Sequence, residues 1–83
     1  MGVTSVVIRD MRNNSFMIMV DENMTVRQVK QTITKNSPNF TDINQMALMF
    51  NGVELENDST LGQVGVKNND VLDVVSTFLG GNL

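Results

Sequence analysis

The chain contains no cysteine, no histidine, no tryptophan and no tyrosine among its 83 residues. Without Cys and His it has no thiol nucleophile, no imidazole base, no disulfide and none of the side chains that zinc sites favour. The remaining carboxylates and hydroxyls are scattered and show no spacing typical of a catalytic pair. The composition therefore predicts a protein that is not an enzyme, holds no metal and needs no cofactor.

Positive charge and long apolar runs are also scarce. Six Lys and Arg residues against nine Asp and Glu give a net charge of −3, and the basic residues form no cluster. This balance argues against binding nucleic acid through its phosphates. No apolar run approaches the roughly 20 residues that a membrane helix needs, and the N-terminus lacks the features of a secretory signal. We expect a cytoplasmic or nuclear protein with no nucleic-acid or membrane partner.

What the chain does have is enough apolar material for one small core. The hydrophobic fraction is 41%, and with only four Phe this core must consist mainly of Val, Leu, Ile and Met. The length allows a single domain. We expect that domain to cover residues 1–79, followed by a flexible tail over residues 80–83, and to be a monomer.

The first third of the chain alternates between apolar and polar residues. Residues 3–10 place Val6 and Ile8 on one face, which is the period of a half-buried strand. A polar turn over residues 11–14 separates this run from a second alternating run. In the second run the predicted inward residues are Phe16, Ile18 and Val20, and the outward residues are Ser15, Met17 and Met19. Two such runs joined by a short turn predict a β-hairpin.

A helix is predicted over residues 25–36. Thr25 and Gln28 have the spacing of a capping box, in which each side chain bonds the backbone of the other residue. The apolar stripe of this helix is Val26, Val29 and Ile33, and Pro38 lies just beyond its end.

The second half of the chain predicts three further strands. Residues 47–50 and 53–55 flank Asn51-Gly52, the strongest short signal for a tight hairpin turn. Residues 56–70 are expected to be irregular, and residues 71–78 form the last strand. Three apolar residues anchor the irregular segment to the core: Leu61, Val64 and Val66. The predicted order is β-β-α-β-β-β, an α+β fold with one helix covering one sheet.

Several segments together resemble the ubiquitin family. They are Thr25-Val26-Arg27-Gln28-Val29-Lys30, Leu48-Met49-Phe50-Asn51-Gly52-Val53-Glu54-Leu55, Asp58-Ser59-Thr60-Leu61, Val71-Leu72-Asp73-Val74-Val75 and Gly80-Gly81. Each is a weak signal alone, but in register they cover nearly the whole chain. The resemblance implies the β-grasp fold, a mixed sheet packed on one helix.

The tail carries the first functional implication of this resemblance. In modifiers of the family the last Gly of a diglycine is joined to a target amine, so Gly81, after Gly80, would be the conjugated residue. A processing protease would first remove Asn82 and Leu83. Thr77 stands where the ubiquitin tail has an arginine, and the adjoining tail residues are Phe78 and Leu79. The implied partners are therefore activating and conjugating enzymes of a dedicated cascade.

The second implication is a recognition face. The resemblance places Met11, Met49 and Val75 where the family has an apolar patch read by receptors with ubiquitin-like-binding motifs, and the strand alternation also turns Met49 and Val75 outward. Asp73 replaces a histidine on the rim, which disfavours acidic receptors. Val7, Met17 and Ala47 are candidates for widening this face. The alternative interpretation is that single exposed apolar residues are ordinary on protein surfaces.

Three functional hypotheses follow. The first is a modifier conjugated through Gly81. The second is a non-conjugated interaction domain of a larger protein that docks through the apolar Met/Val face. A third is a sulfur carrier of the same fold, which the two residues after the diglycine disfavour. The three lysines, Lys30, Lys35 and Lys67, are expected to be solvated surface charges.

Overall fold

The computed structural model describes residues 2–77, which form one mixed sheet and a helical layer. The strands are β1 (Ser5–Arg9), β2 (Ser15–Met19), β3 (Met46–Phe50), β4 (Val53–Glu54) and β5 (Val71–Ser76). The helices are α1 (Val26–Asn36), a 3-10 turn η1 (Ile43–Gln45) and the short α2 (Leu61–Val64).

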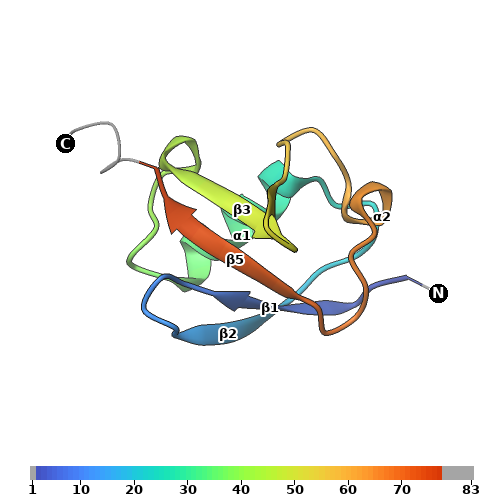
Figure 1. Cartoon of the computed structure of the whole chain (residues 1–83), viewed down its shortest axis with the longest axis horizontal. Coiled ribbons are helices and arrows are strands. Elements are labelled where there is room, and N and C mark those ends of the chain that lie inside the picture. The colour runs from blue at the N-terminus through green and yellow to red at the C-terminus, as the bar shows by residue number, and fades with distance from the viewer. Residues whose placement is uncertain (1, 78–83) are drawn as a thin grey trace.

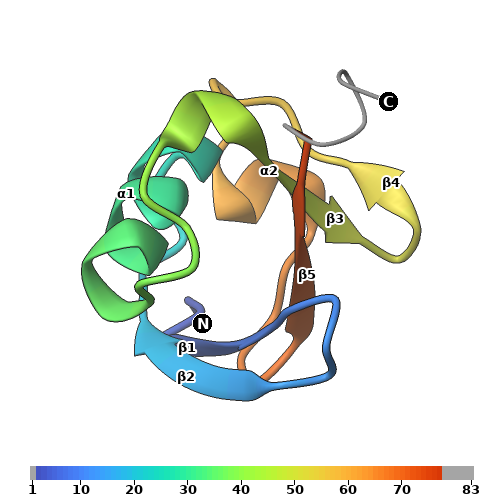
Figure 2. The ribbon, with the colours of Figure 1, turned by 90° about the vertical axis from the view of Figure 1, so that its left-hand side faces the viewer.

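The strand order in the sheet is β2-β1-β5-β3-β4. Strands β1 and β5 pair in parallel at the centre, and every other neighbouring pair is antiparallel. The sheet curves so that α1 lies on its concave side (Figure 1 and Figure 2). This is the α+β arrangement of one sheet on one helix that the sequence predicted.

The first hairpin forms as its alternation predicts. Val6 and Ile8 of β1 are fully buried. Ile18 of β2 and Val20, just after that strand, are also buried, whereas Phe16 is only half-buried against the core. The turn between the strands relies on Asn13, which has a φ of 68°. Asn tolerates this left-handed conformation better than most residues, so the polar turn suits its position.

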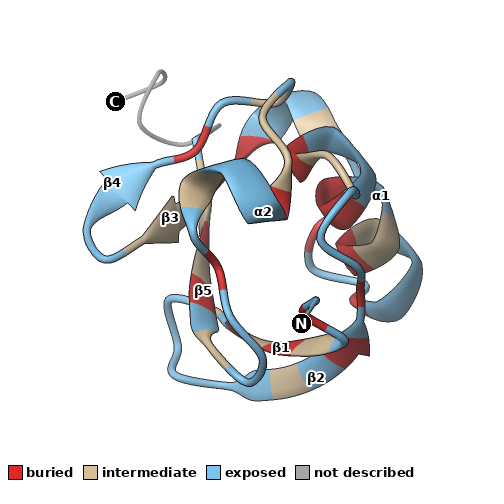
Figure 3. Ribbon diagram, turned by 90° about the vertical axis from the view of Figure 1, so that its right-hand side faces the viewer, coloured by how far each residue is buried: buried red, intermediate tan, exposed pale blue. Residues whose placement is uncertain are grey.

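Helix α1 begins at the predicted capping box. The Thr25 side chain accepts a hydrogen bond from the Gln28 N–H, and the Gln28 side chain accepts one from the Thr25 N–H. The three residues of the predicted stripe are fully buried against the sheet: Val26, Val29 and Ile33. The red segments of α1 in Figure 3 face the sheet, so the helix closes the core.

The irregular segment contains a short helix that sequence reasoning missed. Thr60 and Gln63 form a second capping box at the start of α2, and Gly65 ends that helix with a φ of 82°. The signal was present as Thr60-x-x-Gln63, but only four residues follow the helical pattern, too few for periodicity to show. The predicted anchors are correct, because Leu61 and Val66 are buried and Val64 packs against the core.

The second hairpin turns at Asn51-Gly52, where φ is 53° and 81° respectively. Both positive angles fit the predicted tight turn. Strand β4 is one residue shorter than expected. Leu55 leaves the strand and is buried, while its N–H bonds the Leu48 carbonyl.

Strand β5 ends at Ser76, whereas the sequence placed its end at residue 78. Phe78, Leu79, Gly80 and Gly81 lie outside the described residues. The boundary between residues 79 and 80 therefore stays a prediction. Among residues 2–77, no helix is both long and apolar enough to cross a membrane.

The capping box predicts a measurable stability loss on substitution. Thr25→Ala removes the acceptor for the Gln28 N–H and should lower the free energy of unfolding by about 1 kcal/mol. Thr41→Ala, at an exposed position outside any cap, should change it by less than about 0.5 kcal/mol. Urea unfolding followed by far-UV circular dichroism measures both values. Equal losses in the two variants would show that the box contributes nothing of its own.

Candidate functional site

Strands β3 and β5 place two of the predicted recognition residues, Met49 and Val75, on the convex face of the sheet, away from α1. In the register of β3 and β5, Met49 lies opposite Asp73 and Ala47 lies opposite Val75. Because successive side chains on a strand point to opposite faces, Met49 and Val75 point outward while Leu48 and Val74 are fully buried. We call Met11, Met49 and Val75 the docking face.

Met11 lies in the turn between β1 and β2, two residues beyond Arg9, which pairs with Asp73 of β5. The Asp10 carboxylate accepts hydrogen bonds from the backbone N–H groups of Arg12 and Asn14, both at 2.9 Å. The bond from Asn14 is the main reason that the pKa of Asp10 lies below its ordinary value. The carboxylate thus orders the turn that presents Met11, whose exposed fraction is 62%.

A pocket of about 240 Å³ adjoins Met11. It lies between this turn, the segment before β3 and the end of β5, and its lining combines the apolar Met11 and Phe40 with the polar or charged Asp10, Arg12, Asn39 and Ser76. An exposed apolar side chain beside such a hollow offers a partner both a contact surface and a recess for its own side chain.

The rim of the docking face is less acidic than the sequence indicated. Asp73 is paired with Arg9, whose Nε lies 2.7 Å from a carboxylate oxygen. Arg9 and Asp73 are neighbours in the parallel register of β1 and β5. Sequence reasoning missed Arg9 because local periodicity does not reveal which distant strands pair in parallel. An exposed pair of this kind adds little to stability, but it neutralises a charge that a partner would meet.

The predicted extension of the face is only partly correct. Ala47 points outward but is 3% exposed, so its small side chain adds almost no accessible surface. Val7 and Met17 do lie on the same side of the sheet, and Met17 is 60% exposed. However, the Arg9–Asp73 pair lies between these two residues and Met49 on the surface of the sheet.

Of the tail residues predicted to be recognised by partners, the structure describes only Thr77. It is exposed, and its N–H bonds the Gln45 carbonyl at 3.0 Å, so β5 leads directly from the docking face toward the tail. The conjugation residues Gly80 and Gly81, with Phe78 and Leu79, lie outside residues 2–77, and their roles stay predictions.

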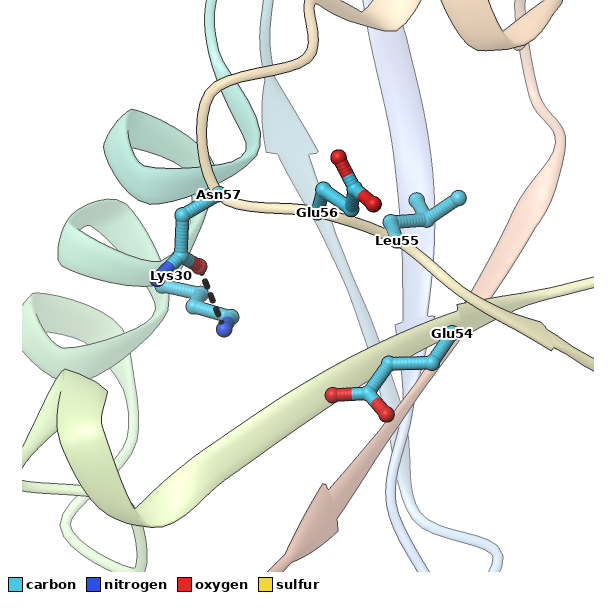
Figure 4. Close-up of a pocket in the computed structure, with 5 residues that line it drawn as sticks. All are labelled: Lys30, Glu54, Leu55, Glu56 and Asn57. Carbon is cyan, nitrogen blue, oxygen red and sulfur yellow. Dashed lines mark hydrogen bonds between the residues drawn. The ribbon is translucent and has the colours of Figure 1, made fainter.

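The expectation for Lys30 was wrong, because this lysine is buried. Its exposed fraction is 4%, and its ammonium donates a 2.6 Å hydrogen bond to the side-chain oxygen of Asn57. Figure 4 shows this bond. The pocket around it has a volume of about 420 Å³, and its lining also includes Glu54 and Glu56. Its place beside Val29 and Ile33 on the buried side of α1 could have indicated burial.

The buried Lys30 ammonium has little contact with solvent and no direct ionic partner among the described residues. Desolvation lowers the pKa of Lys30, although Glu54 acts in the opposite direction and Arg27 adds to the lowering. The amide of Asn57 can accept the hydrogen bond but cannot neutralise the charge. This lysine therefore carries an electrostatic cost within the fold.

The described part of the chain contains no cluster of metal-ligating side chains. No group of three or more Asp, Glu, His or Cys residues within residues 2–77 is arranged to hold a metal ion. The features that remain are the Met11, Met49 and Val75 face and the buried Lys30.

The lowered pKa of Lys30 predicts a dependence of stability on alkaline pH. Between the folded-state pKa and the ordinary lysine value of about 10.4, the unfolded chain binds more protons than the folded chain. The free energy of unfolding should therefore rise with pH through this window. Lys30→Met should remove the rise, and Lys35→Met, at an exposed position, should retain it.

Urea unfolding at intervals from about pH 8 to about pH 11 measures this slope. The absence of Tyr and Cys leaves few other groups that titrate there. Parallel pH profiles for the wild-type chain and Lys30→Met would contradict the assignment.

Comparison with known proteins agrees with the geometry. A model of the ubiquitin family matches residues 6–78. The chain also resembles the solved UBL domain of Plasmodium falciparum Dsk2, with a TM-score of 0.80 and 17% sequence identity. The match covers 92% of this chain and 99% of that domain. No curated protein sequence matches. Because the family model spans most of the sequence and the structure has the ubiquitin-like β-grasp fold, the chain belongs to the ubiquitin family.

Proposed function

We propose that the chain is a ubiquitin-like interaction domain that docks partner proteins non-covalently through Met11, Met49 and Val75. The observation that carries this proposal is the docking face itself, which combines the half-buried Met49 of β3 and Val75 of β5 with the exposed Met11 of an ordered turn. Soluble domains seldom expose a clustered apolar surface without a binding role. Met suits such a surface because its flexible thioether side chain adapts to different partners.

The surroundings of the face support recognition of an apolar partner. The pocket beside Met11 has room for a side chain of the partner, and the Arg9–Asp73 pair leaves the adjacent rim close to neutral. A partner with a strongly charged contact surface would find no matching opposite charge here. We infer that the partner contributes apolar side chains at the centre of the contact and uncharged groups at its rim.

The structural comparison also favours a docking domain over a free modifier. The matched structure is described as a UBL domain, which is one part of another protein. Docking through the sheet requires nothing of Gly81, whereas conjugation requires its free carboxylate. The conjugation hypothesis therefore depends on the tail alone, and docking depends on residues whose positions the structure describes.

One experiment separates the two functions. The full chain and a chain ending at residue 79 are each incubated with lysate of the source organism, with and without ATP. Non-covalent partners and covalent adducts are then counted by mass spectrometry. We expect the same non-covalent partners on both chains and no ATP-dependent adduct. Adducts that require ATP and Gly81 would instead identify a conjugated modifier.

Substitutions on the sheet test whether docking uses the proposed face. Met49→Lys places a charge at its centre and should weaken binding of a purified partner at least about tenfold. Val53→Lys adds the same charge on β4, outside the face, and should leave the affinity unchanged. Calorimetric titration measures the affinity, and thermal unfolding checks that both variants fold. Equal affinities for Met49→Lys and the wild-type chain would overturn the proposed face.

A further inference from the structure

The two margins of the sheet differ in how they are protected. At one margin β4 has only two residues, Val53 and the charged Glu54. At the other margin β2 is five residues long, and no described strand lies beyond it (Figure 1). An exposed edge strand is a template for pairing with another strand unless charge, Pro or a bulge blocks it.

Strand β2 carries none of these blocking features. Residues 15–20, Ser-Phe-Met-Ile-Met-Val, contain no charged residue, no Pro and no Gly. Met17 is 60% exposed and Met19 is 81% exposed. A segment of this length with high β-propensity and no charge is the type that pairs readily with an additional strand.

The hydrogen bonds at either end of the first hairpin show which backbone groups are free. Asp10 N–H bonds the Asn14 carbonyl, and Val20 N–H bonds the Thr4 carbonyl, each at 2.9 Å. In an antiparallel ladder, bonded and non-bonded residues alternate. The N–H and C=O groups that point away from β1 are therefore those of Ser15, Met17 and Met19.

An apolar row across the convex face leads to the middle of this open edge. Val71 pairs with Val7, and Val7 pairs with Met17, so their outward side chains lie side by side across β5, β1 and β2. Met17 is the central residue of β2. If two copies were related by a two-fold axis between their Met17 residues, this row of one copy would continue into the same row of the other.

Charge at the two ends of β2 selects the antiparallel arrangement. Arg12 precedes the strand, and Asp21 and Glu22 follow it, all three exposed. With Met17 opposite Met17, position 12 of one copy lies level with position 22 of the other. Each Arg12 would then lie near the acidic pair of the second copy, whereas parallel pairing would bring like charges together.

We propose that two copies of the chain associate by antiparallel pairing of their β2 edges about Met17. Ser15 of each copy pairs with Met19 of the other, which joins the strands by about six backbone hydrogen bonds. Because such an edge contact buries little surface, the dimer is weak and reversible. The expectation of a monomer was based on the sequence, which does not reveal the strand order. That order leaves β2 at an open edge of the sheet.

Sedimentation velocity of the full chain from about 10 μM to about 1 mM tests the pairing. The wild-type chain should shift from monomer toward dimer across this range. Met17→Lys places two like charges opposite each other and should raise the dissociation constant at least about tenfold. Val53→Lys, at an equally exposed position on the opposite margin, should not change it.

A charge exchange keeps the test independent of Met17. Arg12→Glu should weaken the dimer, and combining it with Glu22→Arg should restore the wild-type dissociation constant. As a second measurement, amide NMR shifts that depend on protein concentration should be confined to β2 and its two flanking turns. A chain that stays monomeric throughout, equal weakening by Val53→Lys, or shifts centred on Met49 and Val75 would each overturn the proposal.

Discussion

The parallel pairing of β1 with β5 is the constraint on which the rest of the structure depends. It places Ile8 beside Leu72 in the centre of the core, where both are fully buried. On the opposite face the same register sets Arg9 beside Asp73. It also brings the turn that carries Met11 to the side of the sheet where β3 and β5 display Met49 and Val75. Core, ion pair and docking face are thus consequences of one strand alignment.

Features that depend on neighbouring residues could be predicted from the sequence. The hairpin at Asn51-Gly52, the capping box at Thr25 and the inward stripe of α1 each need only a few adjacent positions, and all three are confirmed. The outward direction of Met49 and Val75 followed from alternation along single strands. The resemblance to the ubiquitin family implied a β-grasp fold with a mixed sheet, but the order of the strands in that sheet came only from the structure.

Features that depend on distant residues were missed or misjudged. The partner of Asp73 lies 64 positions away, and the burial of Lys30 depends on the segment of Asn57 packing over α1. Ala47 was correctly oriented, yet its accessibility depends on how far its neighbours extend over a small side chain. Local patterns state which way a side chain points, but only packing decides what covers it.

The central position of β1 and β5 also bears on how the chain folds during synthesis. These strands come from opposite ends of the sequence, and Asn68 further ties them by accepting bonds from the N–H groups of Thr4 and Ser5. A sheet whose middle is closed by its last strand has a high contact order, so its transition state must await long-range loop closure. The first hairpin, with its apolar face and uncharged β2, leaves the ribosome well before β5 can join it. The nascent chain therefore passes through a stage in which chaperone binding or premature association competes with completion of the fold.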